Sequence, residues 1–276
     1  MKTIKRLGAI ILLSIGVLAF ANMSSCSDKG MENSMTIIDE TIDTKGFEAK
    51  YESQIKQYDF YGQEHNRVLE GFFTELADKG YNNVADIRNN KSEVITIVTE
   101  SAEKLLRSYQ YLLEEKSSTL EADKIISQVI EKIKKPRTLP KSLTDDSGYI
   151  FSPKQKEMLA MVDNVLYKYR TPKEVFDEMN KATQKAIEVL PERELEAVLV
   201  ASSVAKYSNQ FWYDYFGLDS QIKTRVDPDW IQILEFVVTD ALAAVEMIIA
   251  LPILSSIFPE AVAIYAGAIS LISVIV

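Results

Sequence analysis

The segment from Pro259 to Val276 reads PEAVAIYAGAISLISVIV, and after Glu260 it carries no charged residue. A helix that is apolar on every side is buried either in a protein core or in a membrane. At about 1.5 Å per residue, a helix over 261–276 spans about 24 Å, whereas the hydrocarbon core of a bilayer is about 30 Å thick. A core helix is therefore favoured, with membrane insertion and a tail covered by a partner as the open alternatives.

A second apolar segment, Trp230 to Phe258, comes before this one, and a proline separates the two. Together they predict a hydrophobic helical hairpin over residues 230–276, packed in the core or associated with a membrane. The first arm carries Asp240 and Glu246, two charges that are costly in lipid. Amphipathic helices elsewhere in the chain need an apolar partner, and the hairpin supplies one.

The middle of the chain has the apolar spacing of amphipathic helices. The stretch 92–115, SEVITIVTESAEKLLRSYQYLLEE, places Val94, Val98, Leu105 and other apolar residues at helical spacing, whereas a strand would alternate with period two. Ser92 is the expected N-cap of this helix. Residues 47–78 and 120–135 show the same pattern, so they are expected to be helices too.

Three equally spaced prolines, Pro153, Pro172 and Pro191, predict the starts of three further helices. Proline suits the first turn of a helix because its missing N–H would have no partner there. Ser152 and Thr171 precede two of these prolines and are good N-caps. The third helix is expected to end near the glycine of the stretch YSNQFWYDYFGL, which suits a helix C-cap.

Composition agrees with a helical, globular protein. Hydrophobic residues make up 47% of the chain and charged residues 26%, with only 10 glycines and 8 prolines. The predicted fold class is all-α, a multi-helix bundle with a hydrophobic C-terminal helical hairpin. The expected organisation, in chain order, is a signal peptide (1–25), a tether (26–45), a helical subdomain (46–135), a loop (136–151), a three-helix segment (152–217), a linker (218–229) and the hairpin (230–276).

The N-terminus has the pattern of an export signal. A positive region with Lys2, Lys5 and Arg6 precedes the apolar stretch 7–21. Met23-Ser24-Ser25-Cys26 then resembles the lipobox of bacterial lipoproteins, although that pattern usually has leucine or another aliphatic residue in place of the methionine. The stretch SSCSDKG is similar to the start of many lipoproteins of the Bacteroidota. The alternative is cleavage after Ala19-Phe20-Ala21, which would release a soluble protein.

The lipoprotein resemblance implies an address in the cell envelope. Cys26, the only cysteine, would carry the lipid, so the membrane is the expected partner through that anchor. Ser27 directly after the cysteine favours the outer membrane, by resemblance to sorting in Gram-negative bacteria. The following residues are polar and acidic, and they are expected to form a tether, with a short helix over 35–42 as the alternative.

Little in the sequence points to chemistry. His65 is the only histidine, so we expect no catalytic triad and no histidine-rich metal site, and we expect His65 at the surface or half-buried. No phosphate-binding loop or nucleophile elbow is present, and neither a catalytic residue, a metal nor a cofactor is assigned. The net charge of −9 becomes more negative when the N-terminal cations are removed, which argues against binding nucleic acid.

Two sets of surface candidates remain. Aromatic residues could pack the core or contact a membrane or partner, and the candidates for such contact are Trp212, Tyr213, Trp230 and Tyr265. A basic cluster lies around the start of the expected loop, at Lys132, Lys134, Lys135, Arg137 and Lys141. A solvated helix end, whose cations complement the helix dipole, is favoured over an anion-docking patch.

Two functions follow as expectations. The first is a lipid-anchored envelope protein that acts by binding an unidentified protein partner rather than by catalysis. The alternative is a membrane-active protein, pore-forming or toxin-like, that uses the hydrophobic hairpin. The layout of an apolar hairpin among amphipathic helices is similar to that of pore-forming colicins, in pattern and without a shared motif.

Overall fold

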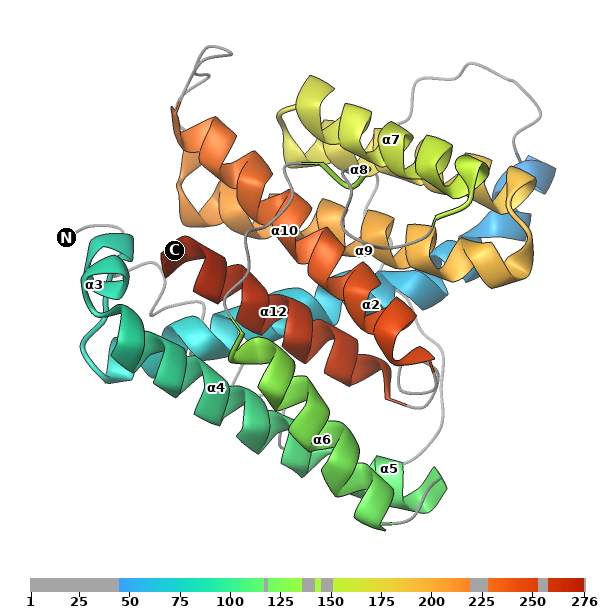
Figure 1. Cartoon of the computed structure of the whole chain (residues 1–276). Helices are drawn as coiled ribbons and strands as arrows, with labels where there is room; N and C mark the ends of the chain where they lie inside the picture. Colours follow the sequence, from blue (N-terminus) through green and yellow to red (C-terminus); the bar gives the residue numbers. More distant parts are fainter. Residues whose placement is uncertain are drawn as a thin grey trace, which may run out of the picture. The chain divides into compact units, whose positions relative to one another are not determined.

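The computed structural model describes residues 45–116, 119–135, 142–144, 151–218, 228–252 and 258–275. These residues form ten helices and no strand, which confirms the predicted all-α bundle (Figure 1). The helices are α2 (Lys45–Asp78), α3 (Val84–Asn89), α4 (Lys91–Ser108), α5 (Gln110–Lys116), α6 (Thr119–Ile133), α7 (Pro153–Lys168), α8 (Pro172–Val189), α9 (Glu192–Tyr215), α10 (Pro228–Ala250) and α12 (Pro259–Ile275). The expected signal peptide lies outside the described residues, as does nearly all of the expected tether.

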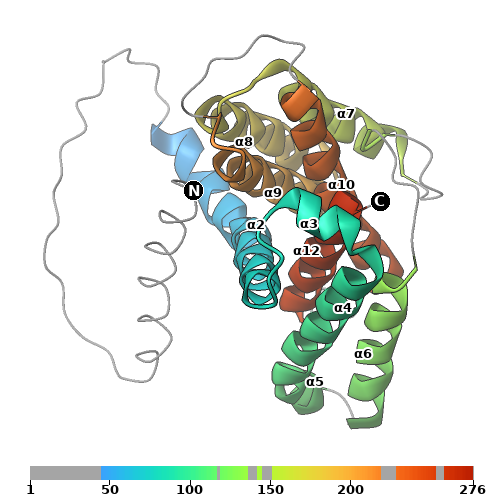
Figure 2. The ribbon, with the colours of Figure 1, turned by 90° about the vertical axis from the view of Figure 1, so that its left-hand side faces the viewer.

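The apolar helix α12 lies at the centre of the bundle. It packs against α2, α3, α4, α6 and α10, and the two ribbon views agree that these helices surround it (Figures 1 and 2). Every residue from Ala261 to Ile272 is buried. In the first arm of the hairpin, α10, every residue from Phe236 to Ile248 is buried as well.

The remaining helices form layers on either side of this centre. Helices α7 and α8 cover α9, which itself packs on α2 and α10. Helices α4, α5 and α6 lie on the opposite side and reach α12 through α4 and α6 (Figure 2). Each outer helix therefore buries one face, as expected of amphipathic helices around an apolar core.

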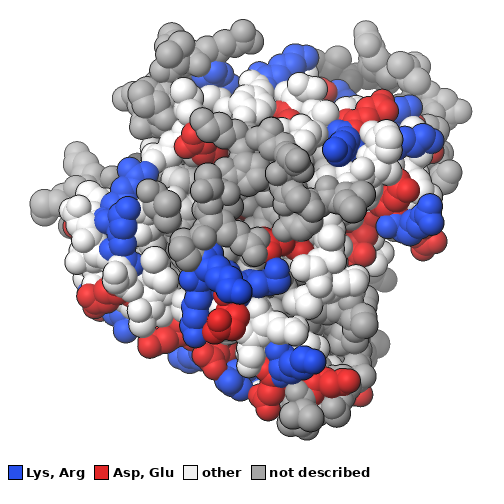
Figure 3. All heavy atoms as spheres, viewed as in Figure 1, with Lys and Arg blue, Asp and Glu red and all other residues white. Residues whose placement is uncertain are grey.

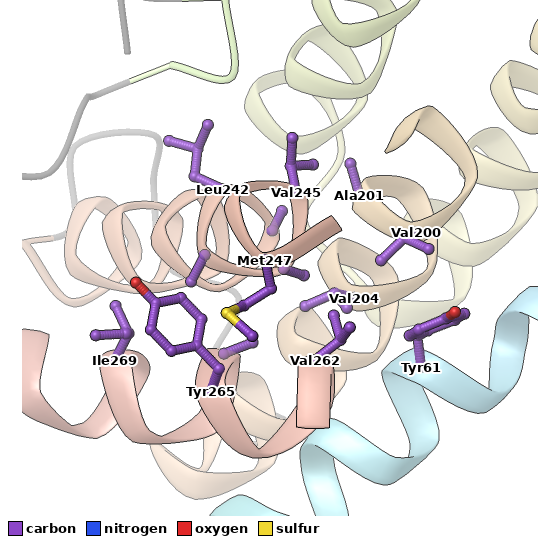
Figure 4. Close-up of a cluster of buried hydrophobic side chains, with 14 of the residues drawn as sticks. Tyr61, Val200, Ala201, Val204, Leu242, Val245, Met247, Val262, Tyr265 and Ile269 are labelled. Carbon is purple, nitrogen blue, oxygen red and sulfur yellow. The ribbon is translucent and has the colours of Figure 1, made fainter. Parts of the chain in front are cut away.

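Apolar side chains from four of these helices interlock at the centre. Met247 of α10 and Tyr265 of α12 point toward one another, and Val204 of α9 and Tyr61 of α2 close the cluster beside Val262 (Figure 4). All five side chains are at least 93% buried. Burying a large apolar side chain contributes about 1.5–3 kcal/mol, so this contact region is a main source of stability.

Two of the three helices that the prolines predict begin at the proline itself. Ser152 and Thr171 both form complete capping boxes, with the side chains of Gln155 and Glu174 bonding back to the cap backbone. The third helix differs from the prediction, because it begins at Glu192 and Pro191 is its N-cap, without a side-chain cap bond. Gly217 follows the end of α9 with φ +64°, the left-handed backbone of a C-terminal cap.

One predicted cap is wrong. Helix α4 begins at Lys91 with Asn90 as its N-cap, so Ser92 lies inside the helix rather than before it. The Asn90 side chain does not cap the N–H groups of α4. Its amide nitrogen instead donates to the backbone carbonyl oxygen of Asp86 in α3. The close succession of α3 and α4 therefore sets this boundary. The helix expected over 92–115 is also divided at Tyr109 into α4 and α5.

Candidate functional site

The most enclosed polar cluster lies where α2, α9 and α10 meet. Ser208 donates a hydrogen bond to Oδ2 of Asp240 at 2.5 Å, and Trp212 Nε1 donates to the same oxygen at 3.2 Å. His65 Nε2 lies 3.4 Å from that oxygen. All four side chains are fully buried. The cluster thus gathers a serine, a histidine and a carboxylate at one point of the core.

The order of contacts in this cluster differs from that of a catalytic triad. In a triad the histidine lies between the nucleophile and the carboxylate. Here Asp240 lies between Ser208 and His65, so the serine hydroxyl donates its hydrogen bond to the carboxylate and does not contact the imidazole. Because the group is also sealed from solvent, it holds helices together and offers no access to a substrate.

A second buried charge lies between α2, α8 and α9. The ammonium of Lys206 is 3% exposed and contacts Asp59 Oδ1 at 2.5 Å and Asn180 Oδ1 at 2.9 Å. It also lies over the rings of Phe176 and Tyr207, at 5.3 and 5.5 Å from their centroids. A buried lysine needs such partners because an isolated ammonium is costly in the interior. Its charge is thereby occupied in joining three helices.

A third polar cluster connects the hairpin to the outer layer. Glu246 of α10 accepts from Lys132 of α6 at 2.9 Å and from the hydroxyl of Tyr265 of α12 at 2.8 Å. The carboxylate is 8% exposed, whereas Lys132 is 26% exposed and reaches in from the surface. This arrangement satisfies the charge that the sequence places in the first arm of the hairpin.

Two tyrosines of α2, Tyr58 and Tyr61, keep their hydroxyl groups in the neutral form. Burial, followed by the nearby carboxylates of Glu196 and Glu260, raises the pKa of the Tyr61 hydroxyl. Burial and then Glu196 raise the pKa of Tyr58, whose ring stacks on that of Tyr61 at 6.1 Å. These hydroxyls are therefore hydrogen-bonding groups and not acids at neutral pH.

The predicted membrane or partner contacts lie mostly inside the bundle. Trp212 and Tyr265 are fully buried and Trp230 is 5% exposed, while Tyr213 is half-buried. Trp212 belongs to an aromatic cluster with Phe73 of α2 and Phe236 of α10. In this arrangement, Trp212, Trp230 and Tyr265 would reach a membrane or partner only if helices separated. Cys26 lies outside the described residues.

His65 is not at the surface, so that expectation is wrong. It is fully buried because it falls on the apolar stripe of α2, where Tyr61, Leu69 and Phe72 are also buried. This spacing is visible in the sequence and would have predicted the burial. Its partner Asp240 lies on α10, far along the chain, and no local pattern connects the two residues.

The basic cluster at the end of α6 is only partly available. Lys132 is committed to Glu246, and Lys134 pairs with Glu131 at 3.6 Å. Arg137 and Lys141 lie outside the described residues. Basic and acidic side chains are interspersed over the face that includes this region (Figure 3). Lys135 is exposed and forms no ion pair with another described residue, so the described part of the cluster offers an anion one uncompensated cation.

Two further kinds of site are absent from the described ranges. No group of three or more His, Cys, Asp or Glu side chains there is arranged to hold a metal ion. None of the helices in that part of the chain is both long and apolar enough to span a membrane.

Comparison of the chain with protein-family models, with curated proteins and with solved structures found no significant match.

Proposed function

We propose that this protein is anchored in the bacterial cell envelope, at the outer membrane, by lipid on Cys26 and acts there by binding a partner protein. The anchor rests on the sequence Met23-Ser24-Ser25-Cys26 after an apolar export signal. A binding role is supported by one structural observation, the complete burial of His65 with Asp240. The only imidazole of the chain is thereby withheld from any substrate.

The anchor is tested by labelling cells with radioactive palmitate and separating membranes from soluble proteins. We expect the native chain to be labelled and membrane-bound, and Cys26→Ser to lose both properties. Ser25→Ala is the matched control, because it keeps a small residue before the cysteine and should be processed normally. Label retained by Cys26→Ser, or a native chain without label, would contradict the anchor.

The binding role needs a separate test with the native, membrane-bound chain. We expect cross-linking in intact cells to recover the same partner in repeated experiments, and the purified partner to bind the purified chain. Hydrolysis of a glycan or peptide by the purified protein would contradict a role in binding alone.

A second candidate function, a membrane-active protein, is favoured by the enclosure of α12. This helix is buried by α2, α3, α4, α6 and α10, an arrangement that also suits a segment protected until it reaches lipid. Release of a dye from anionic liposomes tests this candidate, from neutral pH down to about pH 4, where carboxylates begin to be protonated. Vesicles that stay intact throughout would exclude it.

A further inference from the structure

The hydrogen-bonding neighbours of His65 determine which ring nitrogen carries a hydrogen. Asn66 Nδ2 donates to the backbone oxygen of Tyr207 at 2.8 Å, and a carbonyl oxygen can only accept. The amide nitrogen of Asn66 therefore faces α9, and its oxygen lies 3.1 Å from His65 Nδ1. Because the amide oxygen also only accepts, Nδ1 must be the donor and carry a hydrogen.

This tautomer creates a conflict on the other side of the ring. A neutral imidazole with hydrogen on Nδ1 has a bare lone pair on Nε2. That nitrogen lies 3.4 Å from Asp240 Oδ2, and both side chains are fully buried. A lone pair facing an ionised carboxylate is repulsive, and an uncompensated charge in the core is costly. One added proton turns the contact into an attraction.

We propose that His65 and Asp240 form a buried proton-binding site that holds one proton between them in the folded protein. Asp240 Oδ2 already accepts from Ser208 at 2.5 Å and from Trp212 at 3.2 Å. A proton on His65 Nε2, which has no hydrogen-bond partner of its own in the described part of the chain, would place a positive charge 3.4 Å from that oxygen. The pair is then an imidazolium and a carboxylate, and the core carries no net charge there.

The charges on the surrounding helices are directed elsewhere. On α2, Glu64 pairs with Arg67 at the surface. On α9, Lys206 contacts Asp59 and Asn180, and on α10, Glu246 contacts Lys132 and Tyr265. Tyr265 is the only titratable residue of α12 beyond Glu260. Among the described residues, no other charged side chain is in ion-pair or hydrogen-bond contact with His65 or Asp240.

The proton site makes the attachment of the hairpin dependent on pH. Losing the shared proton leaves one negative charge in the core, and adding a second leaves one positive charge. Either charge would be buried without a counter-charge in the core, where α10 packs on α9 and α12. We therefore expect α10 to be held most firmly at intermediate pH and to loosen toward both acid and base.

Nuclear magnetic resonance of the full-length chain, labelled with ¹⁵N at histidine, tests the site directly. His65 is the only histidine, so both ring nitrogen signals belong to it. At neutral pH we expect both ring nitrogens of His65 to show the chemical shifts of nitrogens that carry hydrogen. The ¹³C chemical shift of the Asp240 carboxyl should be that of an ionised carboxylate. One unprotonated nitrogen together with a protonated Asp240 would also support a shared proton. One unprotonated nitrogen beside an ionised Asp240 would overturn the proposal.

Two variants separate the site from a general effect of burial. In Asp240→Asn the counter-charge is gone, so we expect Nε2 to lose its proton at neutral pH. Ser208→Ala removes one donor and keeps the carboxylate, so the imidazole should stay doubly protonated. A doubly protonated ring in a folded Asp240→Asn chain would overturn the pairing. If that variant does not fold, the measurement on the native chain still decides the proposal.

Discussion

The backbone of Gly62 on α2 lies directly against Ser203 on α9. The N–H of Gly62 donates to Ser203 Oγ at 3.0 Å, and a Cβ at position 62 would lie 2.5 Å from the Ser203 carbonyl oxygen. Only glycine allows two helices to approach so closely at this point. One turn further along α2, the same approach brings Asn66 to the Tyr207 carbonyl, and with it His65 into the core.

Replacing this glycine is therefore expected to separate the helices. Gly62→Ala should lower the free energy of unfolding by about 1–3 kcal/mol, because the new methyl group meets backbone that cannot turn away. Gly71 on the same helix is the matched control, since a Cβ there would have nothing within 4 Å. Gly71→Ala should stabilise the protein by about 0.5–1 kcal/mol. Chemical denaturation followed by circular dichroism measures both, and equal effects would contradict the close approach.

The buried ammonium of Lys206 predicts an asymmetry between two variants. Asp59→Ala leaves Lys206 in the core without its carboxylate, and breaking a buried pair from one side costs about 3–5 kcal/mol. Lys206→Met removes the charge but keeps a side chain of similar length. It leaves Asp59, which is 19% exposed, able to reach water. We expect the smaller loss from Lys206→Met in denaturant titrations. A larger loss from Lys206→Met would show that the ion pair is not what holds this position.

Tyr265→Phe tests the polar contact within the hairpin. It removes the hydroxyl that donates to Glu246 at 2.8 Å and leaves the buried ring in place. Since the acceptor is a charged carboxylate, we expect a loss of about 1.5–3 kcal/mol in the free energy of unfolding. Tyr111→Phe is the control because that ring is 62% exposed, and its change should stay within about 0.5 kcal/mol. Similar values for both variants would contradict the contact.

The features predicted best from the sequence are the helix starts and caps that depend on residues close together in the chain. Pro153 and Pro172 start helices because proline tolerates the first turn, and Ser152 and Thr171 cap them from the position just before. These are interactions within a few residues, so they can be read from a short stretch. The start of α4 was predicted wrongly for the opposite reason, since α3 directly before it sets that boundary.

The contacts within the buried polar clusters could not be predicted from any short stretch of the sequence. Asp240 was recognised in the sequence as a charge that is costly in lipid, but its donors Ser208 and Trp212 belong to another helix. Only the packing of α9 on α10 brings them together. The burial of His65 follows from the apolar stripe of α2, whereas its contact with Asp240 follows from tertiary structure. A candidate site of this kind can be recognised only once the helices are placed.

The capping box of α8 gives a prediction that depends on pH. The side-chain hydroxyl and backbone N–H of Thr171 donate to Glu174, and these bonds lower the pKa of the Glu174 carboxyl from its ordinary value. A lowered pKa in the folded state means that the ionised form is favoured by folding. The contribution is therefore present at neutral pH and is lost as the pH falls through the folded-state pKa of Glu174.

Thr171→Ala removes the cap and should lower the free energy of unfolding by about 1 kcal/mol, while Thr171→Ser keeps the hydroxyl and should cost less. Measured by denaturation at a series of pH values, the difference between Thr171→Ala and the native chain should be larger at neutral pH than in acid, where Glu174 is protonated. Circular dichroism at each pH establishes that both chains start folded. A difference that is the same at every pH would show that the carboxylate of Glu174 takes no part in the cap.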